Sequence, residues 1–431
     1  MDCPNPKKPA VAEAGFPDDA LVEILSRLPV KPLHRSKCVA KAWRDLIADP
    51  LHRKKLPQTL QGFFVIDGGI YSRRGGHKRG RFGFVNLLPR STPLDIDPSF
   101  SFLKKLAEVK ILTLSDCCNG LLLFEHGRRK SGPSDELGYI VCNPTTKQWE
   151  AVPRYGSWPS VYPRREKRHT YLVFDPAISS HFHLIQFWFE FAHLELRHWE
   201  WSSGEEGSSS GEELCRASRE VYRSSVHTYS SETGTWSHIH GDWDEEEEQG
   251  LEVWRKQGLV KPYRGPRRAF SNGVLHFIVS DKDQIAAVDA QGVTQKLIPV
   301  PAMAEGERWP EPGYVAQSQG RLHYINQRSD AQLFIWVLED YDTQEWVVKH
   351  SVSLLELLGK KRHTHRKKDF RVVTMHPDGN VVYIVQNWNR KLISYGMDHK
   401  LLSVIDTLKD VSWAEHFVPY VPYFSVISAH N

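Results

Sequence analysis

The sequence predicts a small all-α domain followed by a much larger all-β domain. Three helix-like apolar patterns are confined to residues 16–50, whereas short runs of β-branched and aromatic residues, separated by turn residues, fill the chain from about residue 60 onward. Two sequence patterns in this second part recur, which indicates a domain built from repeated units. With 431 residues, the chain has room for one large domain and one small one.

The first helix is predicted to begin beside Pro17. Asp18 is its expected N-cap, and Asp19 lies near the positive end of the helix dipole. Pro29 lacks an amide donor and is expected to stop the helix. The apolar positions between these limits have the spacing of one helix face, and they are Leu21, Ile24, Leu25 and Leu28.

Two further short helices are predicted before Pro50. Pro32 suits the first turn of a helix that runs through Cys38, and Asp49-Pro50 ends the next one. The apolar stripe of this last helix contains Val39, Trp43, Leu46 and Ile47. Because a segment of about forty residues buries too little surface for an independent core, it is expected to need a partner surface. The pattern therefore indicates a docking module.

This helical segment closely resembles the F-box. The matching residues, in the family's order and spacing, are Pro17-Asp18-Asp19, Leu21, Ile24-Leu25, Arg27-Leu28-Pro29, Cys38-Val39, Lys41, Trp43, Leu46-Ile47 and Asp49-Pro50. Phe16 departs from the commoner Leu but keeps an apolar contact. The resemblance implies an F-box domain over residues 16–56, preceded by a disordered tail over residues 1–15.

An F-box implies binding to a Skp-family adaptor, and through it to the cullin scaffold of a ubiquitin ligase. The expected interface sets a helix face into a groove through apolar anchors. The alternative is that individual anchors, Trp43 among them, pack only against one another, because hot spots are a minority of any interface. The anchors implied by the resemblance are Pro17, Leu21, Ile24, Leu25, Leu28, Pro29, Val39 and Trp43.

Composition argues against several classes of protein. No apolar run approaches the roughly 20 residues of a membrane-spanning helix, and the N-terminus shows no apolar signal-peptide region. Six cysteines without a CxxC pair are too few for a disulfide framework, so we expect reduced thiols and an intracellular location, in the nucleus, the cytoplasm or both. The net charge of +4 does not require a nucleic-acid partner.

Clusters of like charge are expected in solvated loops. The basic clusters at residues 73–81, 164–169 and 360–368 lack the interleaved aromatic residues of a nucleic-acid stacking platform. The last of them also matches the weak pattern of a nuclear-localisation signal. The acidic segments Ser202–Glu213 and Asp242–Glu248 are expected to form flexible loops between strands.

A hairpin pattern recurs three times among the predicted strands. The predicted strands include Tyr139–Val141, Tyr171–Phe174, His276–Val279, Phe334–Leu338 and Val381–Val385. In each copy a turn-forming residue is followed by Thr three positions later and Trp six positions later. The copies are Asn143-Thr146-Trp149, Ser230-Thr233-Trp236 and Asp340-Thr343-Trp346, with looser ones after Phe174-Asp175-Pro176 and Val288-Asp289-Ala290. The three tryptophans are expected in the core.

A second pattern places a glycine in a tight turn ahead of a strand. The glycines, expected at positive φ, are Gly273 and Gly320, with relatives at Gly120 and Gly379. The first two lie 47 residues apart (320 minus 273) and precede His276 and His323, which we expect to be buried structural histidines. A period near 50 residues is typical of kelch-like blades, which bury their faces only when several close into a ring.

The β domain also resembles the F-box-associated β-propeller of plant F-box proteins. The phrases that carry the resemblance are Cys118–Leu122, Asn143–Lys147, Phe174–Pro176 and Trp336–Tyr341, and it spans residues 60–425. The predicted fold is therefore a small all-α F-box of three short helices followed by an all-β propeller of about six to eight kelch-like blades.

Recognised catalytic motifs are absent from the sequence. There is no Gly-x-Ser-x-Gly, no His-Glu-x-x-His, no phosphate-binding loop and no dinucleotide fingerprint. The pairs His181/His183 and His363/His365 supply too few ligands to fix a metal site. We therefore predict a non-catalytic protein without a cofactor or metal.

The two resemblances together imply the substrate-recognition subunit of a Skp–cullin–F-box ubiquitin ligase. The F-box would dock to the adaptor, and the propeller would recruit a protein target for ubiquitination. No membrane partner is expected. Two alternatives stay open at this point: an F-box scaffold or nucleic-acid-associated regulator that acts outside ubiquitination, and a propeller enzyme such as an oxidase or a glycosidase.

Overall fold

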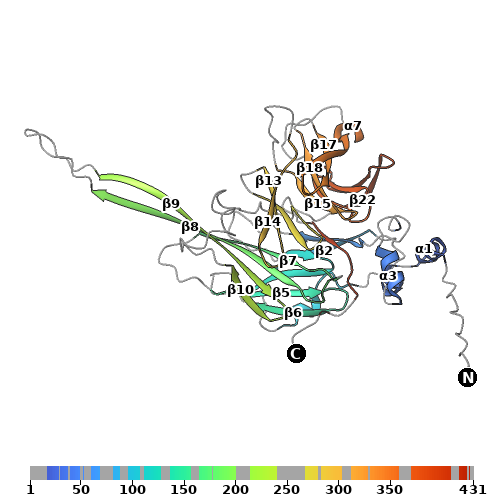
Figure 1. The fold of residues 1–431 in the computed structure, drawn as a ribbon, viewed down its shortest axis with the longest axis horizontal. Coiled ribbons are helices and arrows are strands. Elements are labelled where there is room, and N and C mark those ends of the chain that lie inside the picture. The colour runs from blue at the N-terminus through green and yellow to red at the C-terminus, as the bar shows by residue number, and fades with distance from the viewer. Residues whose placement is uncertain are drawn as a thin grey trace, which may run out of the picture. The chain divides into compact units, whose positions relative to one another are not determined.

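A computed structural model divides the chain into two compact units, Met1–Thr59 and Leu60–Asn431 (Figure 1). Among the described residues, no helix is long and apolar enough to cross a membrane. The structure describes residues 17–28, 30–36, 39–48, 52, 60–67, 81–87, 96–106, 111–127, 136–156, 165–176, 178–199, 214–239, 267–279, 283–302, 312–328, 331–358, 370–408, 417–424 and 427. The predicted N-terminal tail lies outside these residues.

The first unit contains three short helices, α1 (Asp18–Ser26), α2 (Val30–Ser36) and α3 (Lys41–Ala48). The prediction of Asp18 as N-cap is wrong by one position. Pro17 occupies the cap with an extended backbone, and no side chain caps the helix, so that Asp18 and Asp19 both lie in its first turn. Two carboxylates in the first turn still favour the helix through its dipole.

The described strands of the second unit form six antiparallel sheets, which we call blades 1 to 6. Blades 2 to 6 each contain four strands in chain order. They are β3 (Ile111–Cys118), β4 (Leu121–Gly127), β5 (Glu136–Asn143) and β6 (Gln148–Pro153) in blade 2; β7 (Arg165–Val173), β8 (His183–Trp199), β9 (Leu214–Ser230) and β10 (Thr235–Ile239) in blade 3; β11 (Arg268–Ser271), β12 (Val274–Ile278), β13 (Gln284–Val288) and β14 (Thr294–Pro299) in blade 4; β15 (Tyr314–Ser318), β16 (Arg321–Gln327), β17 (Gln332–Asp340) and β18 (Glu345–Ser353) in blade 5; and β19 (Phe370–Met375), β20 (Val381–Gln386), β21 (Lys391–Gly396) and β22 (Leu401–Thr407) in blade 6. Two single-turn helices, α5 (Ser101–Lys104) and α7 (Leu354–Leu357), lie between blades along the chain.

Blade 1 joins the two ends of the second unit. Its described strands follow the order β2 (Arg81–Asn86), β1 (Gly62–Asp67) and β23 (Phe417–Tyr420). The strand nearest the C-terminus pairs antiparallel with the first strand of the unit, which places Val418 opposite Phe64. The ring is therefore closed by hydrogen bonds between segments more than 300 residues apart in sequence (418 minus 64).

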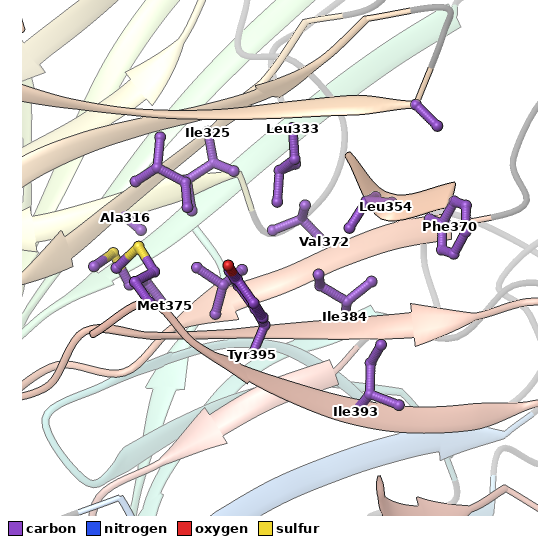
Figure 2. Close-up of a cluster of buried hydrophobic side chains, with 14 residues drawn as sticks. Ala316, Ile325, Leu333, Leu354, Phe370, Val372, Met375, Ile384, Ile393 and Tyr395 are labelled. Carbon is purple, nitrogen blue, oxygen red and sulfur yellow. The ribbon is translucent and has the colours of Figure 1, made fainter. Parts of the chain in front are cut away.

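Each pair of neighbouring blades shares its own buried apolar cluster. Figure 2 shows the cluster between blades 5 and 6, where Ile325 and Leu333 meet Ile384 and Ile393. Six such clusters fill the six seams, including the closing seam between blades 6 and 1. Because a single blade has no second layer of its own, the fold depends on its neighbours. The predicted all-β propeller is confirmed, with six blades, and its geometry is compatible with kelch-like repeats.

The turns between third and fourth strands share one geometry. The side chains of Asn143, Ser230 and Asp340 each accept a hydrogen bond from the amide two residues later, at 3.0, 3.2 and 2.7 Å. All five four-stranded blades place a residue at positive φ at the matching point of this turn: Lys147, Gly234, Gly292, Gln344 and Lys400. The blade 6 copy has no Thr or Trp, so the sequence pattern missed it.

One looser copy of this hairpin was assigned wrongly. Asp175 lies between the first and second strands of blade 3, whereas Asp289 lies between the third and fourth strands of blade 4, as the pattern requires. The glycine turns are confirmed at Gly120, Gly273 and Gly320, with φ of 91°, 77° and 73°. Gly379 does not adopt positive φ, because it lies in a longer connection between β19 and β20.

Strands β8 and β9 are the longest described strands of the ring (Figure 1). Beyond their pairing with β7 and β10 they pair with each other alone, to Trp199 opposite Leu214. The predicted acidic loop at residues 202–213 falls between them and lies outside the described residues, as do residues 242–248, 73–80 and 360–368. The basic cluster at residues 164–169 is corrected, because residues 165–169 form the start of β7 and pair with β8 rather than lying in a loop.

Candidate docking surface on the N-terminal helices

The three helices of the first unit enclose a small apolar core. Val22 and Leu25 of α1 are both 1% exposed, and both pack against residues of α2 and α3. The buried members of this cluster are Leu21, Val22, Leu25, Leu33, Leu46 and Ile47. Val22 and Leu33 lie outside the predicted stripes, because each helix turns a wider face to the core than a single row of positions. The unit therefore buries part of its apolar surface without a partner.

Two large aliphatic side chains of this unit face outward. Ile24 of α1 is 50% exposed, and Val39, in the turn before α3, is 66% exposed. Pro17 at the start of α1 is exposed as well. Exposed single apolar residues are common, so these side chains are candidates for contact with another protein and not evidence of one.

The predicted anchors divide into three groups. Leu21 and Leu25 are buried in the core, so in this chain they support the surface. Leu28 and Trp43 are partly buried against that core and keep some exposed area. Pro17, Ile24 and Val39 are exposed, and Pro29 lies outside the described residues. Periodicity predicted the apolar set, but it did not separate the core from the contact surface.

The first unit also exposes several charged side chains. Arg35 and Lys41 are exposed, and the Nε atom of Arg44 forms an ion pair with the Oδ1 atom of Asp45 at 3.2 Å. Arg27 of α1 forms an exposed ion pair with Glu23 at 2.8 Å. Exposed pairs of this kind add little stability, about 0–1 kcal/mol. The described exposed charges of α2 and α3 are therefore mostly basic, and the ion pairs of this unit constrain its surface only weakly.

In the ring, a buried ion pair ties together the first strands of three blades. Asp116 of β3 accepts a hydrogen bond from the amide of Leu172 in β7 at 2.7 Å, and its other oxygen pairs with the Arg268 guanidinium of β11. Both side chains are under 10% exposed. Burial lowers the pKa of Arg268 to about 9, so it stays charged at neutral pH. This pair was not predicted from the sequence, although the aspartate within the apolar run Ile111–Cys118 is a signal of a buried polar contact.

The buried histidines of the ring are neutral. Burial lowers the pKa of His276 and His323 to about 4, and burial together with His238 lowers that of His227 to about 3. His276 shares a hydrogen bond with Tyr341 of the next blade at 3.1 Å, and His323 contacts the Arg321 carbonyl at 3.1 Å. The predicted burial of His276 and His323 is confirmed, and His276 also interacts with the backbone of Val274.

Neither the histidines nor the cysteines form a metal cluster in the described residues, where no three His, Cys, Asp or Glu side chains gather. His363 and His365 lie outside the described residues. Burial raises the pKa of Cys117, Cys118 and Cys142, that of Cys118 to about 12. These three thiols are therefore poor nucleophiles.

The geometry of the first unit agrees with its match to known proteins. Residues 15–55 match a family model described as the F-box domain. The chain carries an N-terminal F-box. The resemblance suggested by the sequence is thereby confirmed for this segment, and a six-bladed β-propeller follows the F-box along the chain.

Relatives of the chain are F-box proteins of Arabidopsis thaliana. F-box protein At5g07610 is 25% identical over 78% of this chain and 70% of its own length. F-box protein At5g49610 is 25% identical over 79% of each chain. Among solved structures, a chain of the nidogen/laminin complex is 8% identical, covers 83% of this chain and 98% of its own, and has a TM-score of 0.38.

Proposed function

We propose that this chain is the substrate-recognition subunit of a Skp–cullin–F-box ubiquitin ligase. In this proposal the F-box docks on a Skp-family adaptor, and through it on a cullin scaffold, while the propeller binds a protein target. The observation that carries the proposal is that Ile24 and Val39 stay exposed on an F-box whose inner core, around Leu25, is already packed. We expect the protein to act in the nucleus, the cytoplasm or both.

The energetics favour a partner for these two residues. Complete burial of an aliphatic side chain of this size contributes about 1.5–3 kcal/mol, so covering the exposed part of Ile24 and Val39 adds a substantial share of a binding energy. Hot spots of an interface are few, so two exposed aliphatic residues are enough to anchor a contact. The basic residues Arg35, Lys41 and Arg44 would favour an acidic rim on the adaptor.

The propeller would serve as a rigid platform for target recognition. Its described strands form six blades, and binding residues are commonly found on loops carried by such a scaffold. The mechanism needs no catalytic residue in this chain. Holding a target lysine beside a charged ubiquitin-conjugating enzyme raises its effective concentration, as any tethering does.

Copurification with a Skp-family adaptor tests the proposal. The full chain should form a stoichiometric complex, and the double variant Ile24→Asp, Val39→Asp should lose it, because two buried charges would face an apolar groove. The matched control is Ile178→Asp, which charges an apolar residue of the propeller that is 76% exposed and should leave the complex intact. Adaptor binding by the double variant at the wild-type level would contradict the proposal.

A further inference from the structure

The chain continues past the closing strand β23 and crosses blade 2. The described residues of this segment are 421–424 and Ile427, which we call the C-terminal strap. The Asn143 side chain donates a hydrogen bond from Nδ2 to the carbonyl of Tyr423 at 2.9 Å, and the Gln148 side chain accepts one from the amide of Ile427 at 3.1 Å. Asn143 ends β5 and Gln148 begins β6, so the strap is held on both sides of one hairpin turn of blade 2.

Beyond blade 2 the strap reaches blade 3. Ile427 is 3% exposed and belongs to the apolar cluster between blades 2 and 3, which also contains Leu172 and Leu184 of blade 3. The ring of Tyr423 packs edge-on against that of Phe174, which follows the first strand of blade 3, with ring centroids 5.1 Å apart. The end of the chain therefore contacts three blades: β23 pairs within blade 1, and the strap covers the seam between blades 2 and 3.

Gly120, in the turn between β3 and β4, lies against the strap. A Cβ atom at this position would meet the Cβ atom of Tyr423 at 2.6 Å, the carbonyl oxygen of Val421 at 2.7 Å and the amide nitrogen of Tyr423 at 2.8 Å. Gly273 and Gly320 occupy the corresponding turns of blades 4 and 5, also at positive φ, but no described atom lies within 4 Å of a Cβ built there. The close approach at Gly120 is therefore a requirement of the strap and not of the turn.

The closing strand and the strap are held by different interactions. β23 pairs with β1 through a backbone ladder over residues 62–65. The strap is held through side chains, by the hydrogen bonds of Asn143 and Gln148 and by the packing of Tyr423 and Ile427. Because a local opening at a chain end requires less free energy than the opening of core strands, the strap can leave its site while β23 stays paired.

We propose that the C-terminal strap is a latch, which closes the seam between blades 2 and 3 and opens independently of β23. The open form exposes apolar surface of blades 2 and 3 that the closed form hides. Two adjacent thiols distinguish the two events. Cys118 is 5% exposed and lies in the same cluster as Ile427, so it reports on the latch. The Cys117 thiol donates a hydrogen bond to the carbonyl of Pro419 in β23 at 3.2 Å, so it reports on the closing strand.

A chain that ends at Tyr420 keeps β23 and lacks the strap. It should fold, and iodoacetamide should alkylate its Cys118 at least about tenfold faster than in the full chain, because the seam above this thiol is open. Mass spectrometry reads the rate for each cysteine separately. The rate at Cys117 and the hydrogen exchange of the β1 amides should stay at their values in the full chain. The matched control is a chain that ends at Ser428, which keeps Ile427 and should react like the full chain.

An unchanged rate at Cys118 in the chain that ends at Tyr420 would overturn the proposal. Loss of β1 protection or of folding in that chain would overturn it as well, because the strap and the closing strand would then open together. The latch concerns the ring alone and stands whether or not the F-box binds an adaptor.

Gly120→Ala tests the same contact by substitution. Gly120→Ala and Gly273→Ala both place a side chain at positive φ, but only the first also pushes against the strap. Gly120→Ala should therefore lower the melting temperature more in the full chain than in the chain that ends at Tyr420, whereas Gly273→Ala should lower it equally in both. Equal losses from Gly120→Ala in the two chains would contradict the latch, because this glycine would then serve only its turn.

Discussion

The F-box and the propeller use apolar residues in different ways. In the F-box, three helices bury a small core around Leu25 and leave Ile24 exposed on the adjacent face. In the propeller, each blade places apolar residues in a seam with a neighbour, and several large side chains, Phe63 and Phe124 among them, are fully buried. Local periodicity is enough to build the first unit, whereas the second requires contacts between distant segments.

This difference indicates separate tasks for the two units. A small helical core leaves apolar surface for a partner, because it has too few layers to cover every face. A closed ring buries the faces of its own sheets between neighbouring blades, so that loops and strand edges remain for binding. Truncations and substitutions that act on one unit at a time test this division.

Removing the closing strand should have the largest effect. A chain that ends at His416 loses β23 and with it the buried side chains of Phe417, Val418 and Tyr420. Each costs about 2–5 kcal/mol when removed from a core, and the three together cost about as much as the roughly 5–15 kcal/mol that stabilises a typical domain. We expect the ring to lose cooperative thermal unfolding, as monitored by circular dichroism.

A chain that ends at Ser428 is the control for this truncation, because it keeps β23 and Ile427. It should melt like the full chain. Equal melting of the two truncated chains would show that the ring does not depend on its closing strand.

A change in the F-box core should act on the F-box and spare the ring. Leu25→Ala should destabilise the three helices by about 2–5 kcal/mol, because Leu25 is 1% exposed. Ile24→Ala, at a residue 50% exposed, should change F-box stability by less than about 0.5 kcal/mol. Hydrogen exchange of the α1 amides distinguishes the two, and the melting temperature of the ring should stay constant in both. A ring that melts earlier in Leu25→Ala would contradict the independence of the units.

Mild acid should weaken the ring through its buried histidines. The pKa of His276 and His323 is about 4 in the folded ring and about 6.5 when unfolded, so the unfolded chain binds more protons between these values. Stability is therefore fully present above about pH 6.5 and is lost as pH falls toward 4, by at most about 3 kcal/mol per histidine. Urea unfolding at pH 7 and pH 5 measures the loss.

Replacing both histidines by glutamine should flatten this pH dependence. The variant starts less stable at pH 7, so the slope with pH, rather than the absolute stability, is the quantity to compare. A slope equal to that of the wild type would mean that other groups cause the acid sensitivity.

The smallest effect is expected at the hydrogen bonds that tryptophan indoles donate to the fourth strand of the preceding blade. Trp346→Phe removes a hydrogen bond to Pro299 and should cost about 1 kcal/mol. Trp149→Phe removes no described hydrogen bond, so its cost should be markedly smaller. Thermal unfolding of the two variants under the same conditions compares them, and a larger loss in Trp149→Phe would contradict the structural difference between the two tryptophans.

Much of the fold followed from local sequence. The turn chemistry of Asn143, Ser230 and Asp340 predicted hairpins that the structure contains, and the glycines at 273 and 320 predicted the turns between first and second strands. Ring closure could not be predicted, because β23 carries no repeat signature and pairs with a strand at the other end of the unit. The ion pair between Asp116 and Arg268 was missed for the same reason, since sequence spacing does not bring three blades together.

The candidate docking surface was predicted in outline. Helical periodicity marked Leu21, Ile24 and Leu25 alike, but their exposure differs from 1% to 50% because α1 packs against two helices at once. Core and contact residues therefore separate only after the helices are placed. The tryptophans of the hairpin repeat show that sequence spacing does not determine contacts. Trp236 and Trp346 donate an indole hydrogen bond to the preceding blade, whereas Trp149, with the same spacing, is 40% exposed instead of lying in the core as expected.

The affinity of a purified Skp-family adaptor for two forms of this protein tests the central claim most directly. Calorimetry would compare the full chain with a chain that begins at Leu60, the first residue of the second unit. The account predicts one-to-one binding by the full chain and no binding by the shortened one, with the ring melting at the same temperature in both. Undiminished binding by the shortened chain would place the adaptor on the propeller and contradict the account.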